Sequence, residues 1–83
     1  MEARFYVGEE EKHEIYVTYS NLTGKLKIDI DDKRVSDTYD IFFTKTLNFK
    51  IGEKEVHEVM IKISGVFMAH VELYVDSKLV GRA

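Results

Sequence analysis

The 83-residue chain contains no cysteine, proline, tryptophan or glutamine. Without cysteine it has no disulfide bond, no thiolate ligand for a metal and no cysteine nucleophile. Because secreted domains of this size usually carry disulfides, their absence favours a reducing, cytoplasmic location. No apolar run approaches the roughly 20 residues of a membrane span. The first residues, MEARFYVGEEEK, are not typical of a signal peptide. We therefore expect a cytoplasmic protein with no membrane partner.

The distribution of charge and glycine excludes further classes of function. The net charge is −3 with lysine and glutamate interspersed, so no basic stripe is available for nucleic acid. The five glycines are scattered as turn residues, and no glycine-rich phosphate loop exists. The serines stand in turns without the flanks of a nucleophile elbow. We expect no enzymatic activity, no cofactor and no nucleic-acid partner.

Apolar and polar residues alternate with a period of two over most of the chain, which is typical of strands with one buried face. The stretches KHEIYVTY, KLKIDI, EVMIKI and HVELYV show this best. Turn residues separate them, including the pairs Asp31-Asp32 and Asp76-Ser77. We predict one all-β domain spanning residues 1–83. The side chains expected to face inward are Ile15, Val17, Tyr19, Leu26, Ile28, Ile30, Val59, Ile61, Ile63, Val71, Leu73 and Val75.

The segment between residues 36 and 50 does not follow this pattern. Phe42 interrupts the alternation, and Lys45 falls on the apolar side. One interpretation is a bulge or short turn over residues 42–45, with a strand at about 37–39 and another over 46–51. A short helix in this segment is the alternative.

Residues 13–35 and 57–80 are near-copies of each other. HEIYVTYSNLTGKLKIDIDDKRV and HEVMIKISGVFMAHVELYVDSKLV align from His13 and His57, with one inserted residue. A three-stranded meander has one apolar face and is not stable alone, but two copies can cover each other. We predict an antiparallel β-sandwich of about eight strands, built from two meander repeats with pseudo-twofold symmetry. The alternative is that any two meanders look alike.

Four short motifs follow one another along the chain: TGKLKIDIDDK at 23–33, FKIG at 49–52, IKISGVF at 61–67 and ELYVDSK at 72–78. In this order they resemble the domain of the Fas apoptotic inhibitory molecule family. The resemblance spans nearly the whole chain. It implies an eight-stranded antiparallel β-sandwich without catalytic residues, in a cytosolic protein that acts by protein interaction.

The chain departs from this family in three respects. Family members usually contain two such domains, whereas this chain has room for one. Asp32 and Ser77 stand where the family has turn glycines, which suggests that the two hairpins use other turn types. Tyr39 stands where the family's middle strand often has tryptophan. The resemblance therefore supports the predicted fold more strongly than it supports a shared cellular role.

His13, His57 and His70 are the candidates for a metal site, since histidine is the commonest metal ligand. They lack close pairing in the sequence and have no thiolate support, so we expect histidines at strand ends near solvent and no metal. The acidic run DIDDKRVSD lacks the glycine and the distal glutamate of a calcium loop. We interpret it as a turn.

Apolar side chains at outward positions are the candidates for an interaction surface. They are Tyr16, Val56, Met60 and Tyr74, and Phe42 is a fifth. Methionine and aromatic residues are enriched in protein contacts. The alternatives are that such residues are ordinary scattered surface apolars, or that the N-terminal strand RFYV covers them.

The leading hypothesis is a non-enzymatic protein-interaction domain whose specific role the sequence does not define. It would bind a protein partner or form a homodimer through an outer face or an edge strand. One alternative is a small-ligand module that holds an anion or metal near His13 and His57. Another is an accessory domain of a larger complex.

Overall fold

A computed structural model describes residues 1–20, 22–38, 45–64 and 70–83 of the chain. Its strands form two four-stranded antiparallel sheets, and these described ranges contain no helix. The prediction of an all-β sandwich with about eight strands is confirmed. The strands are β1 (Glu2–Val7), β2 (His13–Tyr19), β3 (Leu26–Ile30), β4 (Lys33–Thr38), β5 (Lys45–Ile51), β6 (His57–Ser64), β7 (His70–Val75) and β8 (Lys78–Arg82).

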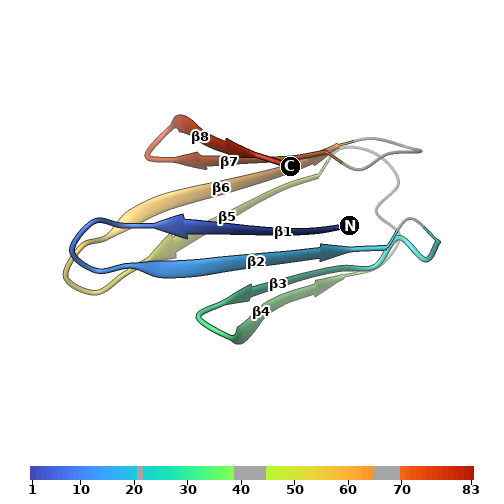
Figure 1. Cartoon of the computed structure of the whole chain (residues 1–83), viewed down its shortest axis with the longest axis horizontal. Helices are drawn as coiled ribbons and strands as arrows, with labels where there is room; N and C mark the ends of the chain where they lie inside the picture. Colours follow the sequence, from blue (N-terminus) through green and yellow to red (C-terminus); the bar gives the residue numbers. More distant parts are fainter. Residues whose placement is uncertain (21, 39–44, 65–69) are drawn as a thin grey trace.

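Each sheet is a meander in chain order. Sheet A has the order β1-β2-β3-β4, and sheet B has the order β5-β6-β7-β8. The repeat unit is thus four strands, one more than the segments 13–35 and 57–80 suggest, because β1 and β5 precede them. The loops β1–β2 and β5–β6 and the turns β3–β4 and β7–β8 all lie at one end of the molecule (Figure 1). We call it the loop end.

The core lies between the two sheets and consists of the inward side chains of the alternating strands. Ile15, Ile28 and Ile61 are completely buried, and among the described residues no polar or charged side chain is buried. Each such isoleucine contributes about 1.5–3 kcal/mol by leaving water. The buried residues are Ala3, Val7, Ile15, Val17, Tyr19, Leu26, Ile28, Ile51, Val59, Ile61, Ile63, Val71 and Leu73. Ile30 and Val75 are partly buried against them, so the predicted inward set is confirmed.

The two short hairpins have the same turn. Asp31 and Asp32 have φ of 52° and 64°, and Asp76 and Ser77 have φ of 50° and 69°. Two central residues with positive φ are the mark of a type I′ turn, whose twist matches that of the flanking strands. The expectation of other turn types was therefore wrong. In these turns the carboxylates of Asp31 and Asp76 accept hydrogen bonds from the backbone N–H groups of Glu14 on β2 and Glu58 on β6.

The strand after the first hairpin differs from the predicted one. β4 starts at Lys33, directly after the turn, and continues to Thr38, so a separate strand at about 37–39 was wrong. The continuity depends on a bulge: Ile28 pairs with Ser36 and Asp29 with Arg34, which leaves one extra residue in β4. A bulge absorbs this residue without ending the strand.

β5 begins at Lys45, one residue before the predicted start of that strand. Lys45, Leu47, Phe49 and Ile51 share the inward side of β5 as the alternation predicts, although only Ile51 is fully buried. Residues 39–44 lie outside the described ranges. The predictions of a bulge or turn over 42–45 or of a helix, and the places of Tyr39 and Phe42, thus stay untested.

Candidate functional site

A second repeat signal lies in the loops that precede β2 and β6. The sequences GEEEKHE at 8–14 and GEKEVHE at 52–58 share the pattern Gly-Glu-x-Glu-x-His-Glu. The sequence alignment began at His13 and missed this pattern, which starts five residues earlier. Gly8 and Gly52 have φ of 102° and 107°, a conformation that L-residues rarely adopt. Each glycine therefore permits the turn that folds its loop back over the loop end.

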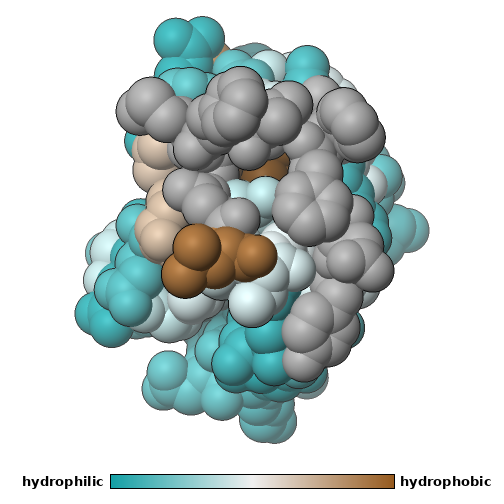
Figure 2. All heavy atoms as spheres, turned by 90° about the vertical axis from the view of Figure 1, so that its right-hand side faces the viewer, coloured by the Kyte–Doolittle hydropathy of each residue, from teal (hydrophilic) through white to brown (hydrophobic). Residues whose placement is uncertain are grey.

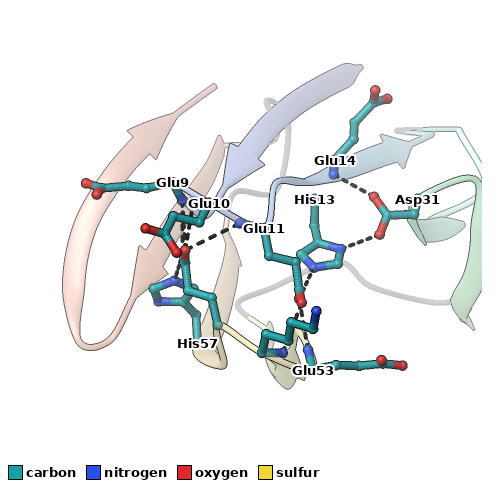
Figure 3. Close-up of polar contacts among 10 residues, drawn as sticks. Glu9, Glu10, Glu11, His13, Glu14, Asp31, Glu53 and His57 are labelled. Atoms are coloured by element: carbon teal, nitrogen blue, oxygen red, sulfur yellow. Dashed lines mark hydrogen bonds and ion pairs between the residues drawn. The ribbon is translucent and has the colours of Figure 1, made fainter.

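The two loops bind each other through one carboxylate each. The Glu11 carboxylate accepts hydrogen bonds from the backbone N–H groups of Glu53 (2.8 Å) and Lys54 (3.0 Å). The Glu55 carboxylate accepts them from Glu9 and Glu10, both at 2.9 Å. We call these reciprocal bonds the loop clasp (Figure 3). Because the donors and acceptors exchange between repeats, the clasp is what a twofold relation between the sheets would produce.

Each repeat also holds a histidine between two carboxylates. In sheet A, His13 Nε2 lies 2.7 Å from Glu11 Oε2, and Nδ1 bonds to Asp31. Asp31 also accepts the backbone N–H of Glu14 at 2.9 Å. The histidine thus connects the clasp glutamate to the hairpin turn (Figure 3).

Sheet B repeats this arrangement with its own residues. His57 Nδ1 lies 2.6 Å from Asp76 Oδ2, and Nε2 bonds to Glu55. Asp76 accepts the backbone N–H of Glu58 at 3.0 Å. Both repeats therefore join loop, strand and turn through a Glu-His-Asp chain.

These contacts shift the pKa of every member of the two chains. Hydrogen bonds from His13 and from the loop N–H groups lower the pKa of Glu11 from 4.5 to about 2, and Glu55 is lowered to about 2 by His57 and its own N–H donors. The pKa of His13 is raised, first by Asp31 and then by Glu11. The pKa of His57 is raised, first by Glu55 and then by Asp76. The arrangement therefore favours the imidazolium form, in which both ring nitrogens donate.

The histidines do not converge on a metal site. Both ring nitrogens of His13 and of His57 face carboxylates, which leaves neither ring with a free nitrogen as ligand. His70 begins β7 opposite Ser64, away from the loop end. No group of three or more potential ligand residues that could hold a metal occurs within the described ranges.

The hollow beside His13 does not favour an anion either. It has a volume of about 500 Å³, and its lining includes Glu11, Asp31 and Glu53 as well as Lys33 and Lys50. Carboxylates in this lining would repel an anionic ligand. The ligand-binding alternative of the sequence analysis thus has no specific support at this place.

The aspartates of the acidic run serve the hairpin and its strands. Asp31 and Asp32 form the turn itself. Asp29 pairs with Arg34, and Asp37 lies 3.5 Å from Arg34 and 3.9 Å from Lys25. Cations therefore neutralise the strand aspartates, which agrees with the interpretation of this run as a turn and its flanks.

The candidate interaction residues lie on different faces of the sandwich. Met60 and Tyr74 are register partners on the outer face of sheet B, and both are partly buried. Tyr16 lies on the outer face of sheet A, which points in the opposite direction. Val56 lies in the β5–β6 loop and is 54% exposed. Phe42 lies outside the described residues, so only Met60 and Tyr74 form a pair.

The N-terminal strand does not cover these side chains as one alternative supposed. β1 pairs edge to edge with β2 in sheet A and thus lies beside the strands, not over their outer face. Only its Arg4 reaches back, with the guanidinium 4.8 Å from the centre of the Tyr16 ring. This contact shields Tyr16 with a charged group, while Met60 and Tyr74 have no such cover among the described residues.

The register of the two sheets shows how their outer faces differ. In sheet B one row of partners crosses all four strands without a charge. We call it the uncharged row, and its members are Asn48, Met60, Tyr74 and Leu79. The equivalent row of sheet A is Arg4, Tyr16, Asp29 and Arg34, with an ion pair between Arg34 and Asp29.

A shallow hollow of about 370 Å³ lies beside the uncharged row, and its lining includes Asn48, Met60 and Ser77 as well as the charged residues Lys50 and Glu58. Leu79, the fourth member of the row, is 41% exposed on edge strand β8. The outer face of sheet B thus combines exposed apolar surface with a depression, and the outer face of sheet A is crossed by charges at the same positions.

Some exposed apolar residues escaped the sequence reasoning. Tyr6 on β1 is 68% exposed, and Leu22, in the β2–β3 connection, is 94% exposed. Figure 2 views the end opposite the loop end and shows some brown, apolar atoms beside largely teal ones. Alternation in RFYV would have found Tyr6, whereas Leu22 lies in a turn-rich stretch without periodicity. Neither residue belongs to the uncharged row.

Comparison of the chain with protein-family models, with curated proteins and with solved structures finds no match. None of the described residues belongs to a helix that is long and apolar enough to cross a membrane.

Proposed function

We propose that the chain is a non-enzymatic protein-interaction domain that docks through the outer face of sheet B. The observation that carries the proposal is the uncharged row, which crosses a face whose counterpart in sheet A is charged. The centres of protein interfaces are depleted in charge and enriched in methionine and tyrosine. Met60 and Tyr74 supply both residue types side by side.

The proposal includes a cytoplasmic location and a relationship to the Fas apoptotic inhibitory molecule family. Support for the relationship comes from the four sequence motifs and their order along the chain. Support for a non-enzymatic role comes from His13 and His57: a histidine that keeps its proton between two carboxylates is a poor general base. Their contacts connect the loops and turns instead, which is a structural task.

Site-specific photo-crosslinking tests the proposed face whatever the identity of the partner. A photoreactive side chain replaces Met60 in one variant and Tyr16 in a matched control, and both are expressed in cells. We expect the variant at position 60 to form a protein adduct and the variant at position 16 to form none. Equal adducts from both positions, or no adduct from position 60, would contradict the proposal.

A further inference from the structure

We propose that the occupant of this face is a second copy of the chain, related by a twofold axis that runs parallel to the strands between β6 and β7. The inference rests on the proposed function, since it names the partner of the same face. A twofold interface must be complementary to itself. On one side of the uncharged row, Lys62 and Glu72 meet this requirement.

Lys62 on β6 and Glu72 on β7 are register partners directly beside Met60 and Tyr74. Rotation about the proposed axis places β6 of one copy over β7 of the other at the same height. Lys62 then faces Glu72 of the second copy, and Met60 faces Tyr74. Each pair occurs twice, so two opposite-charge contacts accompany two thioether–aromatic contacts.

The charges are available for such pairing. Glu72 accepts a hydrogen bond from the Tyr74 hydroxyl at 3.4 Å and lies 3.5 Å from Arg82, and these contacts hold its carboxylate beside the row. Lys62 has no ion-pair partner in the part of the chain that the structure describes. A carboxylate from a second copy would supply one.

A twofold axis along the uncharged row is the main geometric alternative. It would place Glu72 opposite Asp76 of the second copy and Lys62 opposite Glu58, because these residues lie two positions to either side of Tyr74 and Met60. This axis gives two carboxylate contacts and two opposite-charge contacts, as many of each as the proposed axis, which places Glu58 opposite Asp76 in addition to the Lys62–Glu72 pairs. Only the axis parallel to the strands places Met60 opposite Tyr74, whereas the axis along the row places each of these side chains opposite its own copy.

The size of the face limits the strength of the dimer. Four strands spaced about 4.8 Å apart and about six residues long at about 3.3 Å each give a projected face of about 400 Å² per copy. Stable interfaces bury about 800 Å² per partner. We therefore expect weak association, with a dissociation constant in the upper micromolar range.

Two charge variants test the arrangement by sedimentation equilibrium. In a dimer of Lys62→Glu, two carboxylates face each other where residue 62 of one copy meets residue 72 of the other. In a dimer of Glu72→Lys, two ammonium groups face each other there. We expect each variant alone to associate at least tenfold more weakly than wild type, and an equimolar mixture to form heterodimers. Because the two residues are also neighbours within the sheet, circular dichroism confirms the fold of each variant.

Three results would overturn the inference: a monomeric wild type at every concentration, a mixture that stays monomeric, or tighter association of Glu72→Lys, which indicates the axis along the row. Crosslinking from position 60 to a different protein would then leave the proposed function intact. If a charge variant does not fold, Lys62→Cys and Glu72→Cys replace them. Since the chain has no native cysteine, oxidation of their mixture should yield mainly the mixed disulfide, and equal amounts of all three disulfides would contradict the axis.

Discussion

Gly8→Ala should strongly destabilise the domain because it disturbs the turn that positions the loop clasp. Gly8 has φ of 102°. A methyl group on its Cα would overlap the carbonyl oxygen of Glu11 and lie 3.1 Å from the clasp oxygen Oε2 of Glu55. The loop must therefore open, and the N–H groups that bind Glu55 must move with it.

The expected loss can be bounded from general values. Backbone strain at such a φ costs about 1–3 kcal/mol, and displacement of the carbonyl and the clasp adds to it. We expect a loss of at least about 3 kcal/mol from a total of about 4–12 kcal/mol for a domain of this length. The melting temperature should fall by about 12–24 °C. Gly52→Ala should behave alike, since its methyl group would meet the carbonyl of Glu55 and approach Glu11 Oε2 at 2.7 Å.

Thermal and urea denaturation followed by circular dichroism measures the effect. Glu10→Ala is the matched control, because it shortens an exposed side chain in the same loop and leaves the clasp N–H in place. We expect the control within about 0.5 kcal/mol of wild type. A loss of less than about 1 kcal/mol in Gly8→Ala would refute the role of this turn.

The remaining predictions concern pH and the second hairpin. The pKa values of His13 and His57 are raised on folding. The stabilisation that these histidines contribute to the folded state is therefore complete below pH 6.5 and is lost as the pH rises through their folded-state pKa values. The pKa values of Glu11 and Glu55 are lowered to about 2 on folding. The stabilisation that these carboxylates contribute is therefore complete above pH 4.5 and is lost as the pH falls toward 2. Urea midpoints should thus peak between these limits, and a stability that rises steadily up to pH 9 would argue against the two chains. Ser77→Gly relieves a φ of 69° and should stabilise the domain by about 0.5–1 kcal/mol in urea denaturation; a lower midpoint would contradict the turn assignment.

The core was predictable because strand periodicity is a local property. Every second residue of β2 and β6 turns inward whatever the rest of the chain does, so Ile15 and Ile61 could be assigned from the sequence. The type I′ turns were not predictable in this way. Asp31 tolerates positive φ where its carboxylate bonds to the N–H of Glu14, a residue 17 positions away.

The candidate sites depended still more on contacts between distant residues. Glu11 binds backbone groups 42 and 43 positions away, and only the repeated Gly-Glu-x-Glu-x-His-Glu pattern marks it in the sequence. Alternation correctly sends Tyr16, Met60 and Tyr74 outward, but it does not say which strands share a sheet. The pairing of β6 with β7 decides that Met60 and Tyr74 are neighbours and that Tyr16 lies on the other face.

Sedimentation equilibrium over a wide concentration range, on wild type, Met60→Glu and Tyr16→Glu, tests the central claim most directly. The two substitutions place the same charge at equivalent positions of the two outer faces, and circular dichroism confirms that both variants fold. We predict that wild type and Tyr16→Glu associate while Met60→Glu stays monomeric. Association of Met60→Glu with wild-type strength, or an equal loss in Tyr16→Glu, would contradict self-association through the outer face of sheet B.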